Sequence, residues 1–158
     1  MVDHKTGAFF RFVTGMFESE ASVPPNPKLL QLTSLMGRHF QIRDDHYNLT
    51  SDNYTAKKGF CDDLSEGKFS LPLIHLLQHS ASSDRVRGLL FRHKGELSPE
   101  MKIWVLSQMK DVGSLDYVSG ILEHLHENIK RALEDVMADL GHNKQLEDLT
   151  GAWMKIGS

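Results

Sequence analysis

Cysteine, long apolar stretches and β-strand signals are all scarce in this sequence. The single cysteine, Cys61, excludes an internal disulfide and weakly favours a reducing compartment. No catalytic motif surrounds Cys61, so a free structural thiol is the favoured interpretation. No run approaches the roughly 18 apolar residues that span a bilayer, and residues 1–5 lack the apolar core of a signal peptide. We therefore expect a cytoplasmic protein without a transmembrane segment.

An excess of one charge is also missing. The 158 residues include 18 basic and 21 acidic side chains, which gives a net charge of −3. Nucleic-acid binding favours a clustered basic face, so we expect no nucleic-acid partner. The apolar fraction of 40% is enough for a packed core. No repeat or linker interrupts the sequence, and residues 1–158 are one ordinary domain or one large piece of a bigger one.

Helix start and stop signals are frequent along the chain. Asn26 can cap a helix whose first position suits Pro27, Ser98 precedes Pro99 in the same manner, and Gly141 is a stop signal. These signals predict an all-α bundle of seven or so helices, with a polar loop over residues 50–68. Beyond a helix at the N-terminus, the predicted helices cover approximately residues 26–49, 70–80, 82–95, 98–110, 114–140 and 145–156.

The longest of these helices carries an apolar seam with alternating steps of three and four residues. Such a seam is typical of coiled-coil packing. It packs inside the bundle or against a partner, and we favour internal packing. The seam residues are Leu115, Val118, Leu122, Leu125, Ile129, Ala132 and Val136.

On another predicted helix, His75 and His79 share a helix face and could form a metal-ligand pair. No third ligand is evident, so structural packing of these histidines is favoured.

Four polar residues interrupt the apolar second helix. Gln41, Asp44, Asp45 and Asn48 have offsets of zero, three, four and seven, which place them on one helix face. Adjacent carboxylates repel, and burying them costs several kcal/mol unless a cation neutralises them. Their hard oxygen ligands favour Mg²⁺ over zinc. A solvated polar face is the alternative, which the apolar surroundings disfavour.

The loop after this helix is rich in lysine. Lys57, Lys58 and Lys68 bracket an acidic stretch, and lysine neutralises phosphate oxygens as a mobile point charge. Such loops alone are usually just solvated. Beside a carboxylate face that binds Mg²⁺, however, they predict a site for a diphosphate group.

Three segments carry a family resemblance. They are FQIRDDHYNL at residues 40–49, KGFCDDLSEGKFSLP at residues 58–72, and MVDHKTGAFFR at residues 1–11. In this order and spacing they resemble trans-isoprenyl diphosphate synthases, or polyprenyl synthetases. The chain is most similar to the C-terminal half of a fungal geranylgeranyl diphosphate synthase, or of the prenyltransferase domain of a chimeric terpene synthase. The resemblance covers essentially the whole chain and implies a partial isoprenoid-synthase helical bundle.

The resemblance also implies a reaction and site residues. Isopentenyl diphosphate would condense head to tail with an allylic diphosphate, Mg²⁺ would help the diphosphate leave, and the enzyme would be a homo-oligomer. Asp44 and Asp45 match metal-binding positions. Lys5 and Thr6 also match positions that face the developing cation. The positions that match contacts to the allylic diphosphate are Lys5, Thr6, Gln41, Asn48, Lys58 and Lys68.

The sequence departs from the family pattern in several places. His46 stands where Tyr is usual, Ala8 where a second Gly is frequent, and Asn48 where a full motif ends in Asp. The family's first aspartate-rich motif precedes the segment of Lys5 and is absent, so we expect negligible turnover from these 158 residues alone. Without that portion, the helix of Lys5 and the second helix would expose apolar surface.

Two other interpretations remain open at this point. A truncated homologue could serve as a non-catalytic subunit that binds a complete synthase. A class I terpene cyclase shares the helical fold, but it would need an Asn/Ser/Glu-type metal motif in place of the one seen here.

Overall fold

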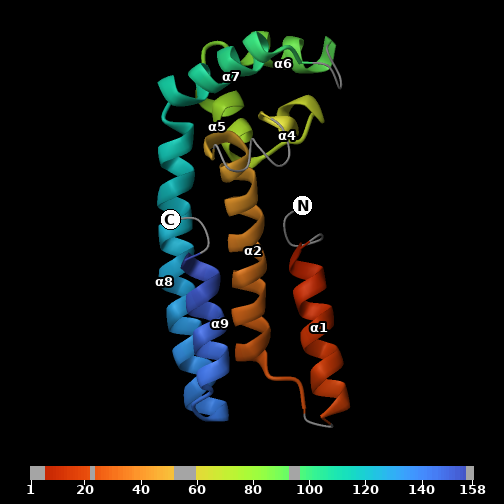
Figure 1. Ribbon diagram of the computed structural model, residues 1–158, viewed down its shortest axis with the longest axis vertical. Coiled ribbons are helices and arrows are strands. Elements are labelled where there is room, and N and C mark those ends of the chain that lie inside the picture. Colours follow the sequence, from red (N-terminus) through yellow and green to blue (C-terminus); the bar gives the residue numbers. More distant parts are fainter. Residues whose placement is uncertain (1–5, 22–23, 52–59, 93–96, 156–158) are drawn as a thin grey trace. The chain divides into compact units, whose positions relative to one another are not determined.

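Every element of the structure is a helix. The computed structural model describes residues 6–21, 24–51, 60–92 and 97–155, and these ranges contain no strand (Figure 1). The all-α fold class is therefore confirmed. The chain divides into two compact units, one made of Met1–Gln41 with Glu123–Ser158 and the other of Ile42–Leu122. Across the same ranges, none of the helices combines the length and apolar character needed to cross a membrane.

The first unit contains α1 (Thr6–Glu20), α9 (Lys144–Lys155), the first part of α2 (Pro27–Thr50) and the second part of α8 (Ser114–Leu140). In its core, Leu32 and Met36 of α2 pack against buried side chains of α8, with Leu146 of α9 beside them. Three seam residues of α8 lie in this core, so internal packing of that part of the seam is confirmed. The α8 residues buried in this core are Ile129, Ala132, Leu133 and Val136.

The helix caps lie where the sequence indicates. The Asn26 side-chain oxygen accepts hydrogen bonds from the backbone N–H groups of Lys28 and Leu29, at 2.9 and 3.1 Å. Ser98 Oγ accepts a longer bond, 3.4 Å, from the N–H of Met101. Each cap satisfies donors that have no partner within the first helical turn. The sequence-based starts of α2 and α7 are therefore confirmed.

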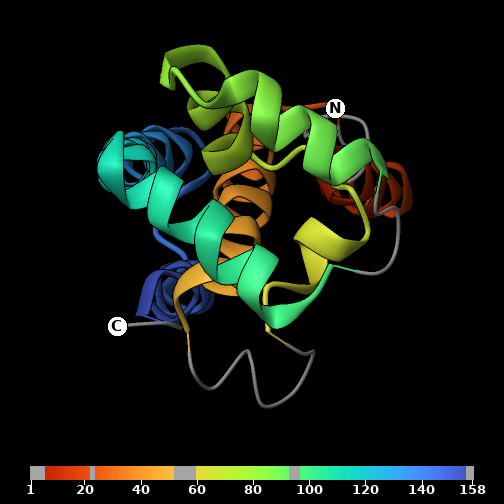
Figure 2. The same cartoon turned by 90° about the horizontal axis from the view of Figure 1, so that it is seen from above.

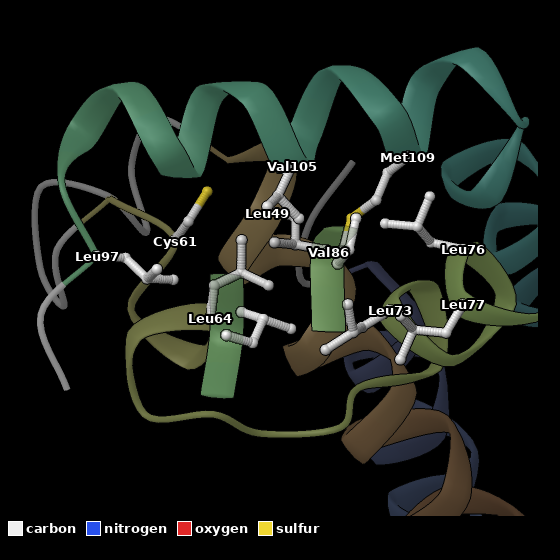
Figure 3. Close-up of a cluster of buried hydrophobic side chains, with 11 residues drawn as sticks. Leu49, Cys61, Leu64, Leu73, Leu76, Leu77, Val86, Leu97, Val105 and Met109 are labelled. Carbon is white, nitrogen blue, oxygen red and sulfur yellow. The ribbon is translucent and has the colours of Figure 1, made fainter. Parts of the chain in front are cut away.

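Among the described residues, the second unit contains four shorter helices together with the end of α2 and the first part of α8. These are α4 (Asp62–Ser65), α5 (Leu71–His79), α6 (Ser83–Arg92) and α7 (Pro99–Asp111), seen from above in Figure 2. Figure 3 shows their apolar side chains pointing toward one another, together with Leu49 of α2 and the thiol of Cys61. Cys61 is a free thiol that is completely buried in this core. The sequence predicts only a polar loop over residues 50–68. The short helix α4 lies within that range, so the prediction of a loop there is corrected.

The histidine pair on α5 has a packing role. His75 Nδ1 lies 3.0 Å from the buried Oγ of Ser114, and its ring stacks on Tyr117 with centroids 4.3 Å apart. The centroid of the His79 ring also lies 4.3 Å from that of His75. Within the described ranges, no three His, Cys, Asp or Glu side chains gather as metal ligands. The contacts of His75 therefore support the structural interpretation.

One face of α1 is apolar and exposed. Phe9, Phe12, Met16 and Phe17 each leave more than half of their surface accessible. They lie three, four and one residues apart, so they follow one side of the helix. This is one of the two helices on which the sequence predicts uncovered apolar surface.

Candidate functional site

The polar face of α2 is the starting point of the site. Because α2 is continuous from Pro27 to Thr50, it carries Gln41, Asp44, Asp45 and Asn48 within two helical turns. Gln41, Asp44 and Asp45 are partly buried, and Asn48 is only 2% exposed. Both carboxylates are thus partly removed from water.

Asp44 and Asp45 of α2 are carboxylates of the type that fits Mg²⁺ shared with a phosphate ligand. Mg²⁺ retains several waters and binds proteins through one or two carboxylates together with substrate phosphates. Asp44 and Asp45 supply that number, and no third acidic, histidine or cysteine ligand joins them among the described residues. A structural zinc site, which needs four protein ligands, is not formed by this set.

His46 points to another side of α2. Its Nε2 lies 3.4 Å from Ser119 Oγ on α8, and its Nδ1 lies 3.4 Å from Thr50 Oγ1. Burial lowers the pKa of His46, because the charged imidazolium loses hydration there. A neutral His46 therefore packs against α8.

Asn48 connects α2 to the segment that follows it. Its buried Oδ1 accepts a hydrogen bond of 3.2 Å from the backbone N–H of Asp63, in the first turn of α4. An amide oxygen can accept this bond at low cost, since no charge is buried with it. A buried hydrogen bond thus joins α2 to the α4 segment.

The α4 segment ends in a tight reversal that depends on glycine. Gly67 has φ of 67°, in the left-handed region where a side chain is strained. Its N–H donates to the carbonyl of Leu64 at 3.2 Å, and the N–H of Lys68 donates to the carbonyl of Asp63 at 2.9 Å. This pair of bonds is a Schellman motif, which places Lys68 directly above Asp63.

Two carboxylates hold the ammonium group of Lys68. Its Nζ lies 2.6 Å from Asp63 Oδ1 and 2.7 Å from Glu66 Oε2. The side chain of Asp63 is 12% exposed and that of Lys68 is 46% exposed. The hydrogen bonds to Asp63 and then Glu66 raise the pKa of Lys68, so it stays charged at all physiological pH values. Lys68 is therefore fixed at its head yet accessible to a ligand.

Lys102 is a second cation at this segment, which sequence reasoning missed. From α7, its Nζ donates a 2.7 Å hydrogen bond to the carbonyl of Phe60 and lies 4.0 Å from a carboxylate oxygen of Asp62. Burial raises the pKa of the neighbouring Cys61 thiol, and Lys102 opposes that effect. The thiol thus stays protonated and unreactive. No motif surrounds Lys102 in the sequence, so only the fold could reveal this contact.

The start of α1 lies beside α2 in the first unit. A Cβ atom added to Gly37 would lie 3.0 Å from the Cα of Gly7, so the two helix backbones touch there. Gln41 follows Gly37 by one turn of α2, and α1 begins at Thr6, next to Gly7. The predicted site residues Lys5 and Lys58, and the side chain of Thr6, lie outside the described part of the chain.

Comparisons with known proteins identify relatives of the chain as a whole. The sequence model of the polyprenyl synthetase family matches residues 1–109. Preaspterpenacid I synthase of Aspergillus terreus is 46% identical over 147 residues, which are 90% of this chain and 19% of that protein. The bifunctional sesterterpene synthase of Talaromyces wortmannii is 43% identical over 150 residues, 92% of this chain and 20% of that protein. Phomopsene synthase of Phomopsis amygdali is 41% identical over 148 residues, with 91% and 20% covered. The chain thus spans about a fifth of these relatives.

Proposed function

Because this chain belongs to the polyprenyl synthetase family, we propose that it forms part of the catalytic domain of a Mg²⁺-dependent trans-prenyltransferase. The substrates are isopentenyl diphosphate and an allylic diphosphate, and the product is of the geranylgeranyl diphosphate type. The relatives are terpene synthases by name, and one is called bifunctional, which supports a place in terpenoid formation. Cytoplasmic location and homo-oligomeric assembly belong to the same proposal.

One observation carries this proposal. The two adjacent carboxylates of α2 and the ammonium of Lys68 belong to segments that the buried bond from Asp63 to Asn48 joins. A metal-bound diphosphate requires acidic ligands and cationic ligands in one place. On a helix face that is merely solvated, Asn48 would have no reason to be buried and bonded to the segment that carries Lys68.

The chemistry follows from these groups. The bond between C1 and oxygen of the allylic substrate breaks, and diphosphate leaves with the electron pair. The alkene of isopentenyl diphosphate then attacks C1, a carbon–carbon bond forms, and the released diphosphate takes up a proton as the double bond is restored. Asp44 and Asp45 would hold Mg²⁺, which would supply Lewis-acid neutralisation of the departing group. Lys68 donates to its oxygens, and stabilising the departing charge is usually the largest rate term.

The remaining predicted residues complete this assignment. Gln41 and the side-chain NH2 group of Asn48 contact the allylic diphosphate from α2. Lys5 and Lys58 add cationic contacts, and Thr6 with Lys5 faces the developing allylic cation. These roles rest on the family resemblance. No three His, Cys, Asp or Glu side chains gather as metal ligands in the described part of the 158 residues, so we propose that turnover by the isolated chain is negligible.

A chimera tests the proposed function directly. The matching 147-residue segment of preaspterpenacid I synthase is replaced by this chain, and prenyl transfer is measured with radiolabelled isopentenyl diphosphate. We expect prenyl transfer in the chimera and its loss after Asp44→Asn. Asp135→Asn is the matched control, because Asp135 is an exposed carboxylate elsewhere, on α8. A chimera that folds and binds diphosphate but transfers no prenyl group would instead favour a non-catalytic subunit.

A further inference from the structure

We propose that Asp63 is a positioning residue, which holds the Lys68 ammonium group where it meets the diphosphate of the allylic substrate. This inference rests on the proposed function, since it assigns a role within that site. Asp63 itself would not touch the substrate. It would act through Lys68, whose placement determines whether the ammonium group reaches a phosphate oxygen.

Three contacts fix Asp63 itself. Its backbone N–H donates to the buried oxygen of Asn48 at 3.2 Å, and its backbone carbonyl accepts from the N–H of Lys68 at 2.9 Å. Its carboxylate lies 2.6 Å from Lys68 Nζ. The residue is only 9% exposed overall, so the carboxylate has little freedom to follow a moving lysine. A side chain that is held at both backbone groups and at its tip is a rigid support.

The groups around Lys68 favour a role for Asp63 in holding the ammonium group in place, and not in attracting the anion by net charge. Lys68 has three N–H donors, and Asp63 and Glu66 accept two of them, which leaves one for a phosphate oxygen. The three side chains together carry a net charge of −1, so the carboxylates oppose the approach of an anion. If charge alone mattered, removal of either carboxylate would tighten diphosphate binding.

A flexible lysine would weaken diphosphate binding because its side chain must be ordered when the ligand binds. Ordering one long side chain on binding costs about 0.5–1.5 kcal/mol, which corresponds to roughly a threefold to tenfold loss of affinity. In the wild-type chain, the contact with Asp63 already orders the Lys68 side chain before a ligand binds. Removal of the Asp63 charge should therefore weaken diphosphate binding, although it makes the site more positive. Positioning and simple charge thus predict effects of opposite sign.

Isothermal titration of inorganic diphosphate with Mg²⁺ into the 158-residue chain tests this sign. We expect Asp63→Asn to bind about threefold to tenfold more weakly. Glu66→Gln is the matched control, because it removes the same charge from an exposed side chain while Asp63 still holds Lys68. It should bind as tightly as the wild type or more tightly. Equal or tighter binding by Asp63→Asn would overturn the proposal.

A double-mutant cycle shows whether the effect passes through Lys68. Once Lys68→Met is present, Asp63→Asn should change the affinity no further, whereas an additional loss would contradict positioning. If Lys68→Met itself binds like the wild type, the proposed diphosphate site fails as well. If Lys68→Met weakens binding and Asp63→Asn does not, only the role of Asp63 fails.

Two measurements separate positioning from a loss of fold. The titration of Lys68 is followed by NMR of its Nζ group, without any ligand. Asp63→Asn should lower the pKa of Lys68, because the Asp63 hydrogen bond is the largest cause of its elevation. Asp63→Glu restores a carboxylate and should recover most of the affinity. An unchanged Lys68 titration in folded Asp63→Asn would overturn the inference.

Discussion

The contact between α1 and α2 yields a prediction that links packing to catalysis. Gly37 is buried on α2, and a Cβ atom there would lie 3.0 Å from the Cα and 3.3 Å from the backbone nitrogen of Gly7. Carbon atoms in comfortable contact are about 3.5–4.0 Å apart. Both obstacles are backbone atoms, which cannot rotate away. Gly37→Ala therefore forces α1 and α2 apart by about 0.5–1 Å.

The expected stability change follows from two opposing effects. Alanine is better than glycine inside a helix by about 1 kcal/mol. Overpacking at a close contact costs about 1–3 kcal/mol. We expect Gly37→Ala to lower the free energy of unfolding by about 1 kcal/mol. Gly15→Ala on α1 is the control, because a Cβ there meets nothing within 4 Å, and it should raise stability by up to about 1 kcal/mol.

Urea unfolding, monitored by circular dichroism, measures both variants. The reasoning also predicts a loss of prenyl transfer by Gly37→Ala in the chimera, since α1 begins at Thr6 and carries a predicted site residue. A displacement near 1 Å can reduce a rate by about 100-fold. If Gly37→Ala stabilised the chain as much as Gly15→Ala, or kept full activity, the close crossing of α1 and α2 would be refuted.

Three further predictions concern the reversal after α4, one histidine and the exposed face of α1. Gly67→Ala should lower unfolding stability by about 1–2 kcal/mol in a urea titration, because its φ of 67° strains any side chain; an unchanged midpoint would contradict that backbone conformation. Burial lowers the pKa of His46 in the folded chain, so the unfolded chain binds more protons below the ordinary value of 6.5. The free energy of unfolding should therefore fall as the pH drops from 7.5 toward 5.5, and it should fall less steeply in His46→Asn than in the wild type. Equal dependence of the unfolding free energy on pH in the two proteins, measured by urea titration, would refute this cause. Phe12→Ser with Phe17→Ser should reduce self-association in sedimentation velocity, because both rings are exposed; unchanged association would show that another surface is responsible.

Much of the fold could be predicted because residues at the helix ends mark where the helices begin and stop. Asn26 and Ser98 accept hydrogen bonds from the first turns of their helices, and Gly141 adopts φ of 87° after the last residue of α8. These residues act locally, so their effect is visible in the sequence. The four-residue helix α4 was missed because its closure depends on Gly67 and on Asn48, a residue remote in the sequence.

The candidate site was predictable in part for the same reason. The spacing of Asp44 and Asp45 on one helix requires only helical geometry, and the structure places both on α2. The support of Lys68 by Asp63 was not foreseen, since Asp63 looks like any acidic loop residue. Its burial arises from packing of α4 against the core, which no local pattern encodes. Lys102 reaches Phe60 across 42 positions of sequence, which is a tertiary contact of the same kind.

The polar face of α2 is proposed to hold a metal-bound diphosphate. A crystal structure of the chimera, grown with Mg²⁺ and a bisphosphonate, is the most direct test. We expect a metal ion against the carboxylate of Asp44 and a phosphonate oxygen within hydrogen-bonding distance of Lys68 Nζ. A bisphosphonate bound away from both side chains, or none bound at saturating concentration, would contradict it.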